Sequence, residues 1–439
     1  MIKQSHTSFR SWVVCMSAAL FFFYGFVQLN VFNALNQELY RAFHLTDETQ
    51  LGRLSAMYFY ANVIFLFPAG IILDRVSTRL LILVMMALCV ISTFLFAMSD
   101  HFWQAELIRF LMGIWGSFFL LSNVRLASRW FPADKLALVI GVIVTLAMLG
   151  GMVAQAPLTM LTDEYGWRHT MIWDGFLGIF IWIIMLFLLR DHPPGQTEES
   201  IAATSHTSDL SFWKTLSLAL GNIQNWLAGI YASMINLPIF LLGATFGSMY
   251  LVQAYHFDRK HASLIVSMIF IGMIVGSPIV GWISDRIKRR KLPMVIGAIL
   301  AMIIVIAIMY RSQQSFLELN ILFFLFGFVM AFQVIAYPVV AESNPESLTG
   351  TSEGIASVLI MGAGLLIPVF PWLLDKHWDH KMVNGFPVYS TSDYHLAFLM
   401  MPVAFAIALV AAFLLRETNC QSFSEREYKH NILEDVTEE

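Results

Sequence analysis

The sequence predicts an all-α integral membrane protein with twelve transmembrane helices in two pseudo-symmetric six-helix bundles. Three observations support this fold class. The 439 residues are 58% hydrophobic and only 13% charged, whereas soluble domains carry about 25% charged residues. Twelve apolar segments are each long enough to cross a hydrocarbon core about 30 Å thick. A short loop signature also occurs once in each half of the chain, which indicates an internal duplication.

The twelve apolar segments are continuous rather than alternating, which favours helices over the strands of a membrane barrel. A span needs about 20 mostly apolar residues, because an α-helix rises about 1.5 Å per residue. The predicted spans are 11–36, 51–73, 79–98, 103–127, 135–160, 168–190, 223–252, 261–284, 292–310, 315–341, 351–375 and 394–416.

The longest polar break near the middle separates six spans from six. Pro193 and Pro194 end the sixth span, because proline cannot continue a helix. Within the break, Ser211–Leu220 contains Phe212 and Trp213 and predicts a helix on the membrane surface. The expected organisation is an N-terminal six-helix bundle over 1–190, a cytoplasmic linker over 191–222, a C-terminal six-helix bundle over 223–416 and a cytoplasmic tail over 417–439.

The loop signature Gly-x-x-x-Asp-Arg follows the second and the eighth span. Its aspartates, Asp74 and Asp285, are 211 residues apart, and each is followed by an arginine, Arg75 or Arg286. Further landmarks recur at offsets of 213 or 214 residues, and they are Pro132 with Pro345, Gly113 with Gly327, and Pro157 with Pro371. This ordered set predicts two parallel repeats related by an axis along the membrane normal.

At these residues the chain resembles the major facilitator superfamily over essentially its full length. The two Asp-Arg loops resemble the family's loop between spans two and three and its counterpart between spans eight and nine, and Arg109-Phe-Leu-Met-Gly113 resembles its fourth-span arginine motif. The resemblance implies a transporter that works by alternating access. It also implies that Asp74, Arg75, Asp285 and Arg286 hold the outward-open state, although the alternative is an ordinary basic turn.

The distribution of basic residues predicts the orientation. With both termini in the cytoplasm, 17 of the 26 lysines and arginines fall in inside segments and eight in outside segments, as expected because basic loops tend to stay cytoplasmic. The loops are short, and the sequence has no Asn-x-Ser/Thr acceptor for glycosylation. We therefore expect an integral protein of a bacterial inner membrane.

In the family that the chain resembles, spans one, four, seven and ten line the central cavity. Their mid-depth polar residues are the substrate-binding candidates, because amides and phenols give directional hydrogen bonds without the cost of a buried charge. The alternative is that some of these side chains only join helices together. The candidates are Tyr24, Gln28, Asn33, Arg109, Ser117, Asn123, Tyr231, Asn236, Gln333 and Tyr337.

Charged residues within the spans are few and are functional candidates, because they are costly in a membrane. Glu106 precedes Arg109 by three residues and lies on the same helical face. This arrangement predicts an anion anchor or a proton-linked carboxylate, and the alternative is a structural pair near the interface. Asp174 in span six either titrates or pairs with Arg168 or Arg109. With no mid-depth acid evident in spans one, seven and ten, coupling uses Glu106 or Asp174, or transport is facilitative or an exchange.

The expected function is secondary active or facilitative transport of a small polar metabolite, as a symporter if a proton is coupled. Uptake of an amino acid, a small peptide or an organic anion is favoured, and export of a siderophore or a drug-like compound is the alternative. The partners expected are a small-molecule substrate, the lipid bilayer and, in a symporter, a coupling proton. No cofactor, no metal site and no enzymatic activity are expected, and the protein is expected to be a monomer. No nucleic-acid partner is expected, since the net charge is only −4.

Overall fold

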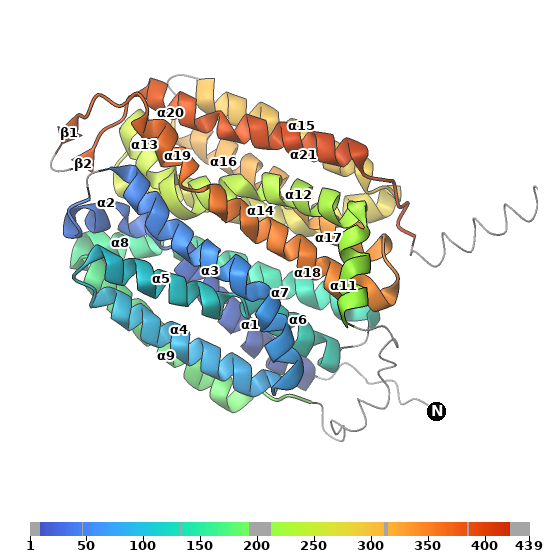
Figure 1. The fold of residues 1–439 in the computed structure, drawn as a ribbon. Coiled ribbons are helices and arrows are strands. Elements are labelled where there is room, and N and C mark those ends of the chain that lie inside the picture. Colours follow the sequence, from blue (N-terminus) through green and yellow to red (C-terminus); the bar gives the residue numbers. More distant parts are fainter. Residues whose placement is uncertain are drawn as a thin grey trace, which may run out of the picture.

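The computed structural model of the chain describes residues 9–45, 47–131, 133–192, 212–310, 315–383 and 386–421. Nearly all of these residues are helical, and most of the helices run side by side along one long axis (Figure 1). One short antiparallel hairpin, β1 (Met382–Val383) and β2 (Phe386–Pro387), interrupts the helices. The prediction of an all-α integral membrane protein with two six-helix bundles is confirmed.

The N-terminal half contains nine helices within the described residues, because several spans are divided by a local break. The first span is divided into α1 and α2, the fourth into α5 and α6, and the fifth into α7 and α8. The helices are α1 (Phe9–Asn30), α2 (Phe32–Ala42), α3 (Glu48–Arg75), α4 (Thr78–Ala97), α5 (Phe102–Gly116), α6 (Phe119–Trp130), α7 (Ala133–Val153), α8 (Ala156–Tyr165) and α9 (Trp167–Leu188).

The helix α11 (Phe212–Gly221) corresponds to the helix predicted at Ser211–Leu220, and the position of α11 on the membrane surface stays a prediction. After α11, the C-terminal half repeats the pattern of divided spans. Its seventh span is α12 (Ile223–Pro238), the π-helix η1 (Ile239–Phe246) and α13 (Gly247–Tyr255). The remaining elements are α14 (Arg259–Ile287), α15 (Lys291–Tyr310), α16 (Phe316–Met330), η2 (Ala331–Ile335), α17 (Ala336–Glu342), α18 (Glu346–Gly362), η3 (Ala363–Leu366), α19 (Val369–Asp375), α20 (Thr391–Phe398) and α21 (Met400–Leu414).

Eleven helical segments of the described residues are long and apolar enough to cross a membrane. The 28-residue helix α3 packs along α5 and runs the same length of the molecule, so it completes the set of twelve (Figure 1). The beginning of α1, the end of α21 and α11 all lie at one end of the molecule, as an even number of spans requires. We call this the inner end, and the opposite end, with α2, α8, α13, α19 and the hairpin, the outer end.

The internal repeat predicted from the sequence is visible in how two helix pairs cross. A Cβ added to Gly113 on α5 would lie 2.1 Å from the carbonyl oxygen of Tyr58 on α3. A Cβ added to Gly327 on α16 would lie 2.0 Å from the carbonyl oxygen of Ile269 on α14. Tyr58 and Ile269 are 211 residues apart, the same offset as the two loop aspartates. The two crossings are therefore equivalent, and each depends on a glycine that lets two backbones touch.

The inner loops of the two halves are also capped in the same way. Asp191, which follows the sixth span, accepts a hydrogen bond from the backbone N–H of Arg79 (2.9 Å) at the start of α4. Glu417, which follows the twelfth, accepts hydrogen bonds from the backbone N–H groups of Arg290 (2.7 Å) and Lys291 (3.0 Å) at the start of α15. A carboxylate at a helix N-terminus is favourable because the helix dipole is positive there.

The two halves pack closely at the outer end. There α2 lies against η1 and α13, α3 against α19 and η3, and α8 against α14. Towards the inner end, α18 packs on α3, whereas over the described residues α6 makes no extensive contact with α12 or α17. This conformation is therefore closed at the outer end.

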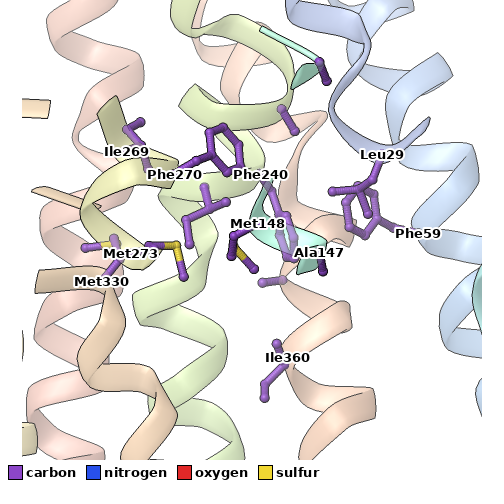
Figure 2. Packing of buried hydrophobic residues seen from close by; sticks show 14 of the residues in the cluster. Leu29, Phe59, Ala147, Met148, Phe240, Ile269, Phe270, Met273, Met330 and Ile360 are labelled. Carbon is purple, nitrogen blue, oxygen red and sulfur yellow. The ribbon is translucent and has the colours of Figure 1, made fainter. Parts of the chain in front are cut away.

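An apolar layer lies between the halves beneath this closed end. Figure 2 shows Phe59 and Met148 of the N-terminal half facing Phe240, Phe270 and Ile360 of the C-terminal half. The rings of Phe59 and Phe240 have centroids 4.6 Å apart. All these side chains are buried, so the layer separates the polar groups of the outer end from those nearer the inner end.

Candidate functional site

A buried arginine lies at the centre of the N-terminal bundle. Arg109 on α5 is 1% exposed, and its Nη1 donates a hydrogen bond to the backbone carbonyl of Gln28 (2.9 Å). Its guanidinium carbon lies 4.5 Å from the ring centroid of Phe32 and 5.1 Å from that of Tyr58. Aromatic faces attract cations, so two rings and one carbonyl hold the side chain in place.

The break between α1 and α2 explains why this carbonyl accepts the arginine. The helix α1 ends at Asn30, and α2 begins at Phe32. The last four carbonyls of a helix lack partners within it, and Gln28 belongs to that last turn. Arg109 supplies a donor where the first span is interrupted.

Asp174 on α9 joins the same cluster through the side chain of Gln28. It is 4% exposed, and its Oδ2 accepts a hydrogen bond from Gln28 Nε2. Gln28 therefore contacts Arg109 with its backbone and Asp174 with its amide. Within the described part of the chain, Arg109 Nε and Nη2, Asp174 Oδ1 and Gln28 Oε1 have no hydrogen-bond partner. Buried polar groups without partners are costly, so this cluster has an unused capacity to bind.

The expected pairing of Glu106 with Arg109 is wrong. Glu106 instead forms an ion pair with Arg53 on α3, at 2.6 Å. Arg53 has a half-exposed side chain, whereas Arg109 points into the bundle, because α3 packs along the side of α5 that carries Glu106. Neither the functional nor the structural version of a Glu106–Arg109 pair is found, because the partner of Glu106 is Arg53.

Of the two alternatives for Asp174, the pairing with Arg168 or Arg109 is wrong, and titration stays a prediction. Arg168 lies at the outer start of α9 and pairs with Asp100 (3.1 Å). Asp174 is six residues further along the helix, about 9 Å deeper, where it contacts Gln28 and not a cation. The carboxylate is therefore buried without a direct ionic partner among the described residues.

Three of the predicted substrate contacts instead bond within their own bundle. The hydroxyl of Tyr24 donates to Thr93 Oγ1 on α4 (3.0 Å), and that of Tyr231 donates to the carbonyl of Met294 on α15 (2.9 Å). Ser117 donates to the carbonyl three residues before it (2.7 Å). These three side chains join or bend helices in this conformation, and their role as substrate contacts stays a prediction.

Asn33 contacts the opposite half at the closed outer end. Its Nδ2 donates to the carbonyls of Leu242 (2.8 Å) and Gly243, and its Oδ1 accepts from the backbone N–H of Ser248 (3.1 Å). Gln155 on the fifth span donates to Gly243 as well (2.8 Å). Leu242 and Gly243 lie in the π-helix η1, whose irregular turn offers carbonyls to other donors. Asn33 is thus a clamp between the halves in this conformation.

Ion pairs and further hydrogen bonds close the same end. Arg259 at the start of α14 forms an ion pair with Asp163 at the end of α8 and donates to the carbonyl of Ala34 (2.6 Å). Thr49 at the start of α3 donates to Asp375 at the end of α19 (2.6 Å). Each of these contacts joins the N-terminal half to the C-terminal half.

The polar candidates nearer the inner end are neutral and largely unused. The side chains of Asn236 on α12, Gln333 on η2 and Tyr337 on α17 make no hydrogen bond with any described residue, and the first two are buried. Asn123 on α6 donates to the carbonyl of Phe119 (2.7 Å), and its Oδ1 has no partner among the described residues. These amides and this phenol have the capacity to bind a polar ligand.

The second loop signature forms a network within the C-terminal half. Arg290 Nη1 donates to Asp285 (2.6 Å), and its Nη2 donates to Glu342 at the end of α17 (2.7 Å). Burial acts to lower the pKa of Arg290, but the hydrogen bonds and charges of Glu342 and Asp285 raise it above its usual value. The Arg290 guanidinium therefore stays charged and ties the loop to the tenth span.

Of the other predicted gating residues, Arg286 makes no contact with this network among the described residues. Arg286 is exposed, and its guanidinium lies 5.4 Å from the ring centroid of Trp282. Asp74 and Arg75 form the last turn of α3, and their side chains lie outside the described residues. The role of these residues in holding the outward-open state stays a prediction.

One acid within the spans was not among the candidates predicted from the sequence, which were Glu106 and Asp174. Glu353 lies on α18 in span eleven, where it is partly buried and makes no hydrogen bond or ion pair with any described residue. The signal was present, because an acid within an apolar run of this length is rare.

Comparison with known proteins identifies the family. The chain matches the sequence profile of the Major Facilitator Superfamily over residues 16–247 and again over 229–431. The chain belongs to the Major Facilitator Superfamily. It is 24% identical over 401 residues to a probable galactarate/D-glucarate transporter, GudP, of Escherichia coli, and the match covers 84% of this chain and 85% of the relative. It is 23% identical over 356 residues to the lysosomal dipeptide transporter MFSD1 of Danio rerio, with 73% of both chains covered.

Solved structures of the superfamily share the fold. A bacterial homologue of the human lysosomal transporter Spinster matches with a TM-score of 0.71 at 14% identity, over 92% of this chain and 97% of the other. The nucleoside transporter NupG matches with a TM-score of 0.70 at 15% identity, over 92% and 98%. Membership of this superfamily makes the protein an integral membrane transporter of a small metabolite and not an enzyme. These relatives are named for different substrates.

Proposed function

We propose that the protein takes up a small hydroxylated organic anion of the sugar-acid class by alternating access. The observation that carries this proposal is the state of Arg109. Its guanidinium is fully buried, pairs with no acid in the described structure and keeps two nitrogens without a hydrogen-bond partner. An arginine stays charged in proteins, and a buried charge requires compensation. A substrate carboxylate that reaches Arg109 in another conformation would provide it.

The neutral polar groups nearer the inner end agree with this substrate class. Asn236, Gln333 and Tyr337 offer donors and acceptors, and Asn123 offers its Oδ1 acceptor, that no described residue engages. Several hydroxyl groups on one small molecule would satisfy such a set, because amides and phenols both donate and accept. The relatives named as galactarate/D-glucarate transporters in Escherichia coli and Bacillus subtilis support the same class.

We assign coupling to a proton, with Asp174 as its candidate site in the N-terminal bundle. Asp174 is buried without a cation, whereas Glu106 is engaged with Arg53. The proposed setting is a bacterial inner membrane with both termini cytoplasmic and a monomer as the working unit. The bundles proposed are 1–190 and 223–416, with 191–222 and 417–439 on the cytoplasmic side.

Uptake of a small peptide or an amino acid is the second candidate. The observation that favours it is the similarity to the dipeptide transporter MFSD1 over 356 residues. A zwitterionic substrate needs an acid as well as a base in the cavity, so this candidate and the first differ in what they require of the site.

The test is counterflow of labelled substrate in proteoliposomes that contain the purified protein. We expect exchange of hexarates or aldonates and none of dipeptides, amino acids or nucleosides. Exchange of dipeptides or amino acids alone would instead support the second candidate and refute the first. The variant Arg109→Ala should abolish exchange of the sugar acid. The matched control is Arg168→Ala, which removes a partly exposed arginine at the outer end of α9. Normal exchange by Arg109→Ala would refute the anchoring role.

A further inference from the structure

Glu353 lies on the face of α18 that points towards the interface between the two halves. Ile360, on the same helix, is part of the apolar layer at that interface (Figure 2). Seven residues are almost two helical turns, so Glu353 lies on the same face about 10.5 Å closer to the inner end. The carboxyl group is therefore on the inner side of the apolar layer, whereas Asn33 and the outer clamp are on the other side.

Among the described side chains of the elements packed against Glu353, no cation pairs with it. α18 packs against α3, α11, α12 and α17, and Tyr337 on α17 is the side chain within electrostatic reach. Glu342 on α17 is engaged by Arg290, and Tyr231 on α12 by Met294. The charged or titratable residues that these four helices carry are Glu48, Arg53, Tyr58, Tyr60, Asp74, Arg75, Lys214, Tyr231, Tyr337 and Glu342.

We propose that Glu353 is the group that releases the coupling proton at the inner side of the membrane. An unpaired carboxylate is tolerated in a membrane protein where water reaches it. Glu353 is partly exposed in this conformation, which is closed at the outer end. When the inner halves of α6, α12 and α17 come together, this water is lost and the neutral acid is favoured. The proton therefore leaves Glu353 for the inner solution when the inner end opens, and the proton that neutralises the carboxyl group for the next cycle is taken up from the outer side.

This inference rests on the proposed function, because it requires coupling to a proton. It assigns a residue that is separate from the N-terminal cluster: Asp174 is sealed beside Gln28, whereas Glu353 is on the opposite half and accessible in this conformation. The neighbouring neutral group Tyr337 places the exchanging acid beside one of the groups proposed for the substrate.

The variant Glu353→Gln separates coupling from transport, because glutamine has the same shape but no proton to exchange. In proteoliposomes we expect it to keep counterflow at equal pH, which needs no net proton movement, and to lose accumulation driven by an inward proton gradient. The control is Glu164→Gln, which alters an exposed acid at the outer end of α8. Accumulation at the wild-type level would overturn the proposal, and so would loss of both activities by a folded variant.

A second measurement keeps the proposal testable if Glu353→Gln does not fold. A hydrophobic carbodiimide labels protonated carboxyl groups in membrane proteins, and the modified residue can be located by mass spectrometry of the wild-type protein. We expect labelling of Glu353 that falls as the pH is raised from about 5 to about 8, and no labelling across this range would overturn the proposal. If no sugar acid shows counterflow, the substrate proposal fails, while the labelling still decides the role of Glu353.

Discussion

Replacement of Asn33 by alanine should open the outer end of the transporter. The Asn33 side chain makes three hydrogen bonds to Leu242, Gly243 and Ser248, all across the interface between the halves. At about 0.5–1.5 kcal/mol for each net hydrogen bond, their loss weakens the closed state by about 1.5–4.5 kcal/mol. Since 1.4 kcal/mol is a factor of ten, the ratio of outward-open to outward-closed molecules should rise by about tenfold to about a thousandfold.

The assay is double electron–electron resonance between spin labels on the two halves at the outer end. Cysteines at Arg41, on α2, and Lys376, after α19, are suitable because both side chains are exposed. Asn33→Ala should add or enlarge a population with a longer distance between the labels. The control is Asn30→Ala, since Asn30 is also buried but donates to the carbonyl of Phe26 in its own helix (2.7 Å). If both variants give the wild-type distance distribution, the side chain of Asn33 does not hold the halves together.

Two further predictions concern the packing and charge of the same fold. Gly113→Ala should lower the thermal unfolding temperature, because the added Cβ meets the Tyr58 carbonyl and overpacking costs about 1–3 kcal/mol. The control is Gly141→Ala, which should not lower it, because a Cβ there has nothing within 4 Å. Equal unfolding temperatures for the two variants would contradict the close crossing of α3 and α5. Asp163→Asn should enlarge the population with a longer spin-label distance by less than Asn33→Ala does, because the ion pair of Asp163 with Arg259 is partly exposed and contributes about 0.2–1 kcal/mol. High salt should enlarge the same population in the wild type, because salt screens exposed ion pairs. A distance distribution that does not change with salt would exclude this contribution.

The fold was predictable because its signals are local or periodic. Apolar runs of about 20 residues specify spans without reference to one another. The recurrence of Gly113 as Gly327 and of Asp74 as Asp285 adds the two-fold repeat. The breaks within spans were not predicted, since the π-helix η1 depends on donors such as Asn33 that come from the other half.

The pairing within the candidate site was less predictable, because the partners are distant in sequence. Glu106 lies three residues from Arg109 but pairs with Arg53, which is 53 residues away. Gln28 and Asp174 are 146 residues apart. Spacing on one helix shows which side chains share a face, but the neighbouring helix decides which of them are paired.

The glycine crossings have a consequence for how the transporter moves. At Gly113 and at Gly327, one backbone touches another with no side chain between them, so neither pair can slide or tilt internally without a steric clash. Each pair, α3 with α5 and α14 with α16, therefore moves as one rigid unit during the transport cycle. We expect the helix bending that alternating access requires to occur at the breaks in the neighbouring spans, which are Val31 in the first span and η1 in the seventh.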